Sequence, residues 1–251
     1  GLAERALKAI QSAARVFSVS ESLKNLAVQH GADPARIEVI GNGVDIERFK
    51  PVDRGTARSA QSIPLNAEVL ISVGGLVPRK GFHRVIDVMP ALRIAHPDLK
   101  FLIVGGPNPE GNNLPQLERQ VKELGLQDCV TFLGPVKPDQ LPALLSAADV
   151  FVLATSNEGW ANVFLEAMAC GLPVVTTDVG GNREVVNDDS LGFITPLDDR
   201  DALADAISRA LATQWDCRHI RNYAENNAWD ERIERLCARF ASIAVAQEKK
   251  A

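Results

Sequence analysis

The stretch VFVLATSNEGWANVFLEAMACGLPVVTT, residues 150–177, contains a strand, a loop, a helix and a second strand in direct succession. Val150–Leu153 is a short apolar run, typical of a strand that is buried on both faces. A turn of small residues over Gly159–Asn162 leads into an apolar helix that ends at Gly171, and Pro173 begins the next strand. Such a unit is typical of a parallel sheet with crossover helices.

The same alternation continues on both sides of this stretch. The predicted strands are Val16–Val19, Ile37–Ile40, Val69–Val73, Phe101–Val104, Val130–Leu133, Val150–Leu153, Val174–Thr176 and Phe193–Thr195, and the predicted helices include Phe82–His96, Leu114–Leu124, Pro138–Ala148, Ala202–Ala212 and Asp230–Gln247. The pattern predicts an α/β fold, a Rossmann-like parallel sheet with helices on both faces. Ligands of such sheets bind in the loops at the carboxyl ends of the strands.

Composition excludes several classes of protein. The net charge of −5 argues against a general nucleic-acid binder. The cysteines, at 129, 170, 217 and 237, form no C-x-x-C pair, so we expect reduced, mostly buried thiols of a cytoplasmic protein. The four histidines are scattered and supply no zinc site. No apolar run approaches the roughly 18 residues that a membrane span needs.

The loop Gly74–Gly81, GGLVPRKG, follows one predicted strand and opens a helix. Its glycines let the backbone approach an anion, the helix start adds a positive end, and Arg79 and Lys80 add full charges. These features suit a diphosphate, although the order is neither that of a P-loop nor that of a dinucleotide fingerprint. The alternative is a turn with a solvated basic pair.

Two carboxylates bracket the start of the helix after Gly159. Glu158 precedes it and Glu166 lies about one turn inside, while the amides of Asn162 and Val163 are unpaired donors of a helix start. A carboxylate accepts hydrogen bonds from two hydroxyls, which suits a sugar or a ribose. Alternatively, Glu158 compensates the helix dipole and Glu166 is solvated. The apolar neighbours of Glu166 favour an engaged side chain.

These residues resemble a known family. Glu158 and Glu166 form an E-x7-E motif, and with the blocks GLPVV (171–175) and DVGGNREVV (178–186) they resemble the retaining glycosyltransferases of family 4, also called glycosyltransferase group 1, which have the GT-B fold. Segments 18–22, 40–45, 74–81, 132–136 and 147–150 also match, so the resemblance covers nearly the whole chain in order.

The resemblance implies a role for each loop. Lys80 would bind the donor phosphates and stabilise the leaving diphosphate, Glu158 would contact the donor sugar, and Glu166 would hold the ribose. The amides of Asn162 and Val163 would meet the phosphates, and the backbone from Gly134 to Val136 would face the base. The predicted catalytic residues are Lys80 and Glu158, and the predicted donor-binding residues are Gly74, Gly75, Arg79, Lys80, Gly134, Pro135, Val136, Glu158, Gly159, Trp160, Ala161, Asn162, Val163 and Glu166.

One position departs from the family pattern. The family usually has Arg after the first glycine of the phosphate loop, where this chain has Gly75. Arg79 is the predicted replacement, because its fork suits phosphate. The resemblance implies no metal and no cofactor, with UDP as the first expected nucleotide. The D-x-D run at Asp199–Asp201 is interpreted as a helix N-cap and not as a metal motif.

The resemblance also implies a domain organisation. Residues 1–50 are the predicted tail of an N-terminal domain with its crossover, residues 51–228 the nucleotide-sugar-binding domain, and residues 229–251 a helix that returns to the N-terminal domain. The acceptor would bind mainly to that missing domain, so we expect this chain to be weakly active or inactive alone. Membrane association is undecided, with peripheral attachment left open beside a cytoplasmic location.

Four alternatives remain. A catalytically silent nucleotide-sugar binding module would use the same loops, and so would a GT-B-type epimerase or a sugar phosphorylase. The E-x7-E spacing and the GLPVV block favour the transferase over the other enzymes. A nicotinamide oxidoreductase is disfavoured because the glycine fingerprint with its downstream ribose acid is missing.

Overall fold

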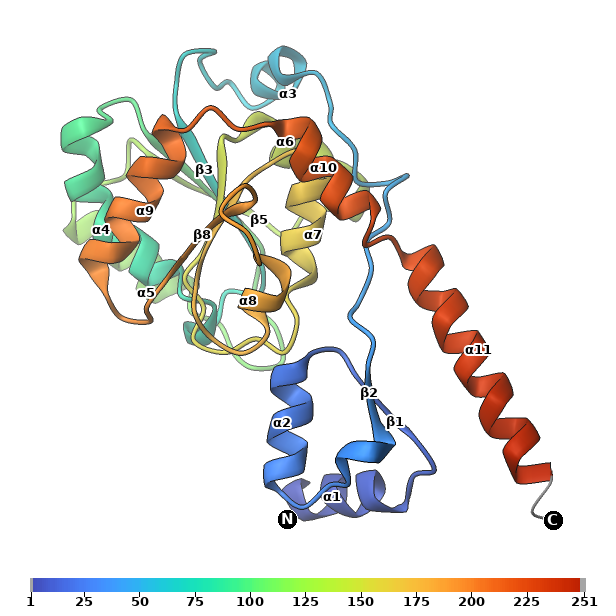
Figure 1. Ribbon diagram of the computed structural model, residues 1–251. Coiled ribbons are helices and arrows are strands. Elements are labelled where there is room, and N and C mark those ends of the chain that lie inside the picture. The colour runs from blue at the N-terminus through green and yellow to red at the C-terminus, as the bar shows by residue number, and fades with distance from the viewer. Residues whose placement is uncertain (1, 249–251) are drawn as a thin grey trace.

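The structure is a computed structural model that describes residues 2–248. Gly1 and residues 249–251, which belong to the first and third predicted segments, lie outside the described residues. Figure 1 shows a large α/β lobe, a small lobe formed by the first 40 or so residues, and a long C-terminal helix that runs from the large lobe down beside the small one. The carboxyl ends of the large sheet's strands face the small lobe.

The large lobe is built on a parallel sheet whose strand order is β5-β4-β3-β6-β7-β8. Its strands are β3 (Val69–Val73), β4 (Lys100–Val104), β5 (Val130–Gly134), β6 (Val150–Leu153), β7 (Val174–Thr177) and β8 (Gly192–Thr195). The central strands are almost wholly buried, as their continuous apolar runs predict. The strand order reverses between β3 and β6, and ligands of open α/β sheets bind at such a switch point.

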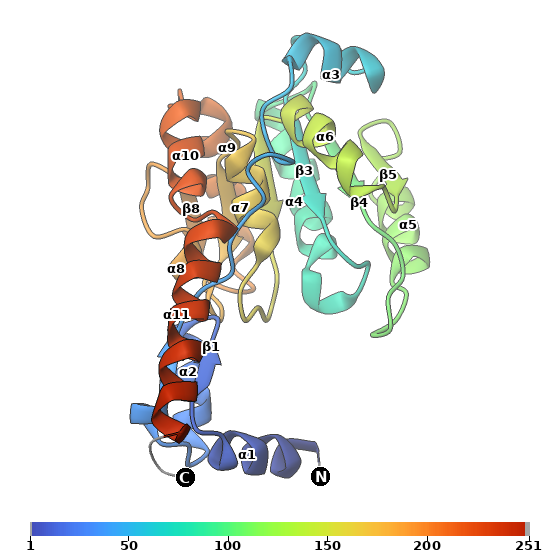
Figure 2. The same ribbon diagram turned by 90° about the vertical axis from the view of Figure 1, so that its right-hand side faces the viewer.

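Helices cover both faces of this sheet, which confirms the predicted fold class (Figure 2). On one face α4 packs against α5 and α9, and on the other α7 packs against α6 and α10. The helices of this lobe are α3 (Arg54–Ala60), α4 (Phe82–Ala95), α5 (Leu114–Glu123), α6 (Leu141–Ala147), α7 (Asn162–Ala169), α8 (Asn182–Val185), α9 (Arg200–Ala212) and α10 (Cys217–Glu225). Short 3-10 turns cover Pro34–Arg36, Pro78–Lys80 and Pro138–Gln140.

The sequence located the strands and most of the helices correctly. Asp199 caps α9 by accepting a hydrogen bond from the Ala202 amide, as predicted for the D-x-D run. Helix α10 was not predicted, because it is polar and buries only Ile220 and Ala224. Two buried positions are too few to reveal a helical period.

The small lobe contains α1 (Leu2–Ser12), α2 (Glu21–Gln29) and the parallel pair β1 (Val16–Ser18) and β2 (Ile37–Val39). The chain crosses to the large lobe after β2 and returns at α11 (Trp229–Glu248). The two crossings meet where Val44 pairs with Ala228.

Helix α11 runs beside the strands of the small lobe. The rings of Phe17 and Phe240 meet edge to face, with centroids 5.4 Å apart, and Arg239 Nε lies 2.9 Å from Glu38 Oε1. Ile233 and Phe240 nevertheless remain 50% and 57% exposed. These apolar side chains of α11 are therefore only partly covered within this chain.

The cysteine prediction is half right. Cys129 and Cys170 are buried, whereas Cys217 and Cys237 are exposed. Burial raises the pKa of the Cys170 thiol to about 12 and keeps it protonated at neutral pH. The exposed pair lies on α10 and α11, two polar helices at the edge of the fold.

A buried arginine ties the start of the large lobe to its sheet. Arg58 on α3 is fully buried, and its Nη2 lies 2.8 Å from Asp149 Oδ2. Its Nη1 donates to the carbonyl oxygens of Ala67 at 2.7 Å and Leu65 at 2.8 Å. Asp149 Oδ2 also accepts a hydrogen bond from the Val69 amide, at the start of β3. Burial lowers the pKa of Arg58, and Asp149 opposes that shift.

We predict that Arg58→Met destabilises the chain by about 3–5 kcal/mol. The substitution removes one partner of a buried ion pair and leaves buried carbonyl oxygens without a hydrogen-bond donor. Arg54→Met is the matched control, because Arg54 is half exposed and pairs with the same carboxylate, so its loss costs about 1 kcal/mol or less. Urea unfolding followed by circular dichroism measures both. Equal losses for the two variants would contradict the assignment of Arg58.

Candidate functional site

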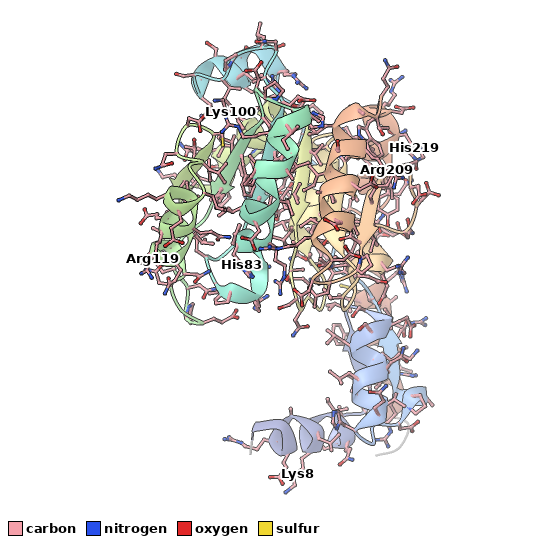
Figure 3. The ribbon with its side chains drawn as sticks, turned by 90° about the vertical axis from the view of Figure 1, so that its left-hand side faces the viewer. Lys8, His83, Lys100, Arg119, Arg209 and His219 are labelled. Atoms are coloured by element: carbon pink, nitrogen blue, oxygen red, sulfur yellow. The ribbon has the colours of Figure 1, made fainter. Side chains whose placement is uncertain are left out.

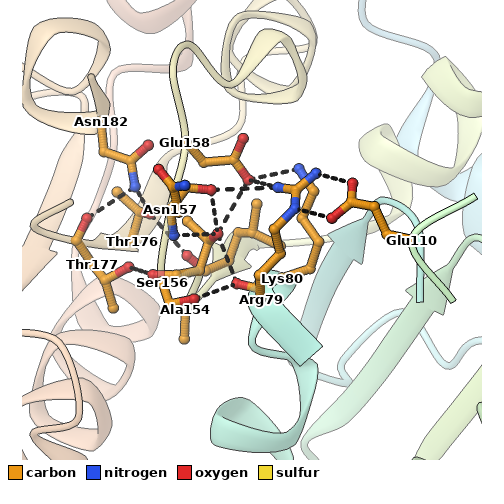
Figure 4. A network of polar contacts seen from close by, with 12 residues as sticks. Arg79, Lys80, Glu110, Ala154, Ser156, Asn157, Glu158, Thr176, Thr177 and Asn182 are labelled. Carbon is orange, nitrogen blue, oxygen red and sulfur yellow. Dashed lines mark hydrogen bonds and ion pairs between the residues drawn. The ribbon is translucent and has the colours of Figure 1, made fainter. Parts of the chain in front are cut away.

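Two charged side chains meet at the switch point of the sheet. Lys80 lies in the loop after β3, and Glu158 lies in the loop after β6 (Figure 4). Lys80 Nζ donates to Glu158 Oε1 at 2.7 Å, and Arg79 Nη1 lies 3.4 Å from the same oxygen. The structure thus joins residues that are 78 positions apart and that the sequence proposed for one site.

Glu158 is buried but keeps one oxygen free. The residue is 8% exposed, and its hydrogen bonds to Lys80, Arg79 and the Thr155 hydroxyl all use Oε1. Among the described residues Oε2 has no partner, and it points away from the basic side chains (Figure 4). The carboxylate is held by cations on one side and can accept hydroxyl groups on the other.

The loop after β3 is locked against the loop after β6. Gly81 adopts the left-handed conformation, at φ +73°, and a Cβ there would come within 1.8 Å of the Ala154 carbonyl oxygen. The carbonyl of Arg79 accepts a hydrogen bond from the Ser156 amide at 2.7 Å. Only glycine fits this approach, so Gly81 sets the position from which Lys80 reaches Glu158.

The loop after β7 holds Glu158 from the other side. Gly180, at φ +53°, lies so close that a Cβ would meet the Glu158 carbonyl oxygen at 1.8 Å, and the Gly181 amide donates to that oxygen at 3.1 Å. Asn182, fully buried, donates from Nδ2 to the Thr177 carbonyl at 2.9 Å and the Thr176 hydroxyl at 3.0 Å. The block DVGGNREVV therefore fixes the backbone of Glu158.

Arg79 has a partner that the sequence analysis missed. Its Nε and Nη2 each lie 2.6 Å from an oxygen of Glu110, in the loop after β4. This pair raises the pKa of Arg79 and lowers the pKa of Glu110. The Asn108 side chain in the same loop occupies the space beside Gly75, because a Cβ there would meet Asn108 Nδ2 at 2.3 Å. The glycine at position 75, where the family usually has arginine, thus leaves room for the side-chain amide of Asn108.

Helix α7 begins without a side-chain cap. Its N-cap is Ala161, which leaves the first amides of the helix, at Asn162 and Val163, free for an anion. The Asn162 side chain instead accepts a hydrogen bond from Asn42 in the crossover at 3.0 Å. The Trp160 ring lies against Gly41, where a Cβ would come within 2.6 Å of it. Both side chains therefore face the crossover.

Glu166 lies about one turn into α7 and is partly buried. It makes no hydrogen bond to another residue within the described chain, so the expectation of an engaged side chain is not met by a protein group. Burial raises the pKa of Glu166 to about 7, and the charge of Arg48 opposes that shift. Arg48 Nε lies 3.5 Å from Asp139, shortly after the predicted base loop Gly134–Val136. The charge of Arg48 therefore acts on Glu166 and on the turn that follows this loop.

A mostly apolar cavity of about 710 Å³ opens between α1, α2 and β1 in the small lobe, with Leu7, Phe17 and Leu26 in its wall. Between residues 2 and 248, no three His, Cys, Asp or Glu side chains gather as a metal site. No helix in that range is both long and apolar enough to cross a membrane.

Comparison with known proteins gives consistent matches. The family model "Glycosyl transferases group 1" matches residues 53–227, and "Glycosyltransferase Family 4" matches residues 2–48. A D-inositol 3-phosphate glycosyltransferase of Corynebacterium urealyticum is 35% identical over 248 residues, covering 94% of this chain and 58% of the relative. One of Mycolicibacterium paratuberculosis is 33% identical, covering 90% and 52%. The chain thus spans little more than half the length of these relatives.

Solved structures agree with the fold. Anabaena Alr3699/HepE in complex with UDP and glucose has a TM-score of 0.85 at 26% identity, covering 95% of this chain and 66% of that one. Sucrose-phosphate synthase from Thermosynechococcus elongatus has a TM-score of 0.83 at 28% identity, covering 96% and 61%.

We predict that stability without ligand falls as pH rises through the pKa of Glu166. Its folded pKa of about 7 exceeds the ordinary 4.5, so the folded state binds this proton more tightly. The resulting stabilisation is full below about pH 4.5 and is lost as the pH rises to 7, a change of about 3 kcal/mol. Glu166→Gln should lack that change when unfolding is measured at pH 5 and pH 8. Exposed Glu123→Gln is the control, and parallel profiles for both variants would refute the prediction.

Proposed function

The chain belongs to the group 1 glycosyl transferases, and from that membership we propose that it is the donor-binding part of a retaining glycosyltransferase of family 4. In this proposal residues 51–228 bind a nucleotide-diphosphate sugar. Residues 1–50 end an acceptor-binding domain and cross over, and the helix in 229–251 returns to that domain. Full transfer then requires both parts, and a cytoplasmic location, with a membrane surface as the alternative, stays a prediction.

The observation that carries the proposal is the Lys80–Glu158 pair at the switch point. A diphosphate that enters beside Lys80 meets a cation already positioned at the end of β3, and the free Oε2 of Glu158 can accept sugar hydroxyls. As the bond to the sugar breaks, negative charge grows on the leaving diphosphate, and Lys80 stabilises it without rearrangement. The retained anomeric configuration is inherited from the family resemblance.

Helix α7 supplies the second part of the proposed donor site. Its uncapped amides at Asn162 and Val163 offer hydrogen bonds to phosphate, and the positive end of the helix adds to the charge of Lys80. Glu166, deeper on the same helix, would bind the ribose, and the Gly134–Val136 backbone would face the base. These basic groups and amides support transfer without a metal or a cofactor.

Two findings from relatives guide the choice of substrates. The Anabaena neighbour binds UDP and glucose, which supports UDP as the first nucleotide to test. The curated relatives are named for D-inositol 3-phosphate, which is the first acceptor to test. These names give no support to the epimerase or silent-module alternatives.

Arg79 is the proposed substitute for the arginine that the family usually has at position 75. It lies next to Lys80 and reaches Glu158, so its guanidinium borders the space proposed for the diphosphate. Glu110 already neutralises it through two short contacts. Donor phosphate would therefore share Arg79 with Glu110 or displace it, which reduces the net gain from this contact.

The apolar groove of the small lobe fits the same proposal. Its wall consists of aliphatic and aromatic side chains from α1, α2 and β1. Burying this apolar surface against another part of the protein would be favourable. Because the relatives are nearly twice as long as the matched region, we assign this cover to the rest of an acceptor-binding domain.

We predict that this chain binds UDP without magnesium and that Lys80→Ala weakens binding by at least about tenfold, the value of a charged hydrogen bond. Lys100→Ala is the control, because Lys100 lies far from the proposed site. It is at the opposite end of the sheet from His83, which follows the loop that carries Lys80 (Figure 3). Calorimetric titrations with UDP, GDP and ADP would measure this and name the base. Failure of all three to bind, or equal affinity for both variants, would refute the proposed site.

We predict a smaller loss, about threefold to tenfold, for Arg79→Ala, because a partly solvated contact to phosphate contributes less than a buried one. Arg93→Ala is the matched control, as Arg93 also makes a forked, surface contact, with Asp128. UDP affinity at low and high salt measures the effect. Unchanged affinity in Arg79→Ala would remove Arg79 as the substitute.

A further inference from the structure

The first turn of α2 in the small lobe is capped by a side chain from the large lobe. Glu184 on α8 accepts hydrogen bonds from the Glu21 amide at 2.8 Å and the Ser22 amide at 3.0 Å, one on each carboxylate oxygen. The Ser20 hydroxyl, which is the helix's own cap, accepts from the Leu23 amide at 3.1 Å. A helix begins with four amides that lack partners, so Glu184 satisfies two that local residues do not.

The capped turn also touches the loop that carries Glu158. Gly159 lies under Leu23, where a Cβ would come within 2.7 Å of Leu23 Cδ1. Gly181 lies under Ser20, where a Cβ would meet the Ser20 Cβ at 3.1 Å. Because the Gly181 amide also donates to the Glu158 carbonyl, the turn before α8, the start of α2 and the Glu158 backbone form one three-way contact.

We propose that Glu184 is a positioning residue that clamps α2 onto the large lobe and thereby holds the Glu158 loop ready for the donor. The carboxylate complements the positive end of α2 and gives a charge-assisted bond to each of two amides. Without it, α2 can move away from Gly159 and Gly181. The contacts that hold the Glu158 backbone on the side of α2 are then weakened. The inference rests on the proposed function, because it assigns Glu184 a role in donor binding.

The clamp also provides a route between the lobes. If donor binding favours the fixed Glu158 loop, then by reciprocity it favours the docked state of α2. A change in the angle between the lobes would first alter the hydrogen bonds of Glu184 to α2. It would then reach the Glu158 loop through the contact that α2, the turn before α8 and the Glu158 backbone form together. Donor binding and the position of the small lobe are therefore coupled through one carboxylate.

The test is amide hydrogen exchange on the full chain, with and without UDP, for wild type, Glu184→Ala, Glu184→Gln and Asp53→Ala. Asp53 is the matched control, because its carboxylate caps α3 by accepting from the Thr56 amide at 2.8 Å, away from the site. We expect Glu184→Ala to speed exchange about fivefold in both residues 20–26 and residues 156–164, the scale of a lost cap. Glu184→Gln, which keeps an acceptor oxygen, should fall between it and wild type.

UDP provides the second readout. In wild type it should slow exchange in residues 20–26, and in Glu184→Ala this slowing should vanish while UDP affinity falls on the order of fivefold, the lower range of coupling between sites. Asp53→Ala should speed exchange only near α3 and leave UDP affinity unchanged. If Glu184→Ala alters residues 20–26 alone, with residues 156–164 and UDP affinity as in wild type, Glu184 is a simple helix cap and the inference is wrong.

Failure of the proposed function gives a different result. If wild type binds no UDP, the donor site is wrong, yet exchange in residues 156–164 of the ligand-free variants still tests the clamp. Unchanged exchange there in Glu184→Ala overturns the positioning role whether or not UDP binds.

Discussion

The contact between Lys80 and Glu158 is the constraint that organises the large lobe. A carboxylate as buried as Glu158 costs several kcal/mol unless a cation and hydrogen bonds accompany it. The cation arrives from a loop 78 residues earlier, which requires β3 and β6 to be neighbours and their loops to touch. Gly81 makes that touch sterically possible. The reversal of strand order and the close loop contact thus serve one ion pair.

This arrangement also explains how a ligand-free site can hold so much charge. Lys80 and Arg79 face Glu158 and Glu110, so the four side chains are neutral together before any donor arrives. In the proposed function, an incoming diphosphate would exchange one set of ionic partners for another and would not meet bare, solvated cations. Because the Lys80 side chain is already largely buried and held by Glu158, little reorganisation would remain for the proposed transfer step. The same reasoning predicts that the partly exposed Arg79 contributes less.

How far the sequence could predict this structure depends on whether a feature follows from neighbouring residues or from residues far apart in the chain. The strands were predictable because a strand buried on both faces is a continuous apolar run, and the loops because ligands of parallel sheets bind at carboxyl ends. Lys80 and Glu158 followed from those two rules and from the family resemblance. Glu110 and Glu184 were not found, since their partners lie 31 and 163 residues away and nothing in the local pattern marks them.

The block DVGGNREVV shows what such a resemblance leaves unexplained until its contacts are known. Gly180 and Gly181 have no side chains because the Glu158 carbonyl and the Gly159 backbone occupy that space. Asn182 anchors the turn to β7, and Glu184 reaches α2 from a helix of only four residues. Since Glu184 lies three residues beyond the amide that holds Glu158, motion of α2 cannot be absorbed by an intervening loop. Short covalent distance therefore makes this turn a stiff link between the small lobe and the site.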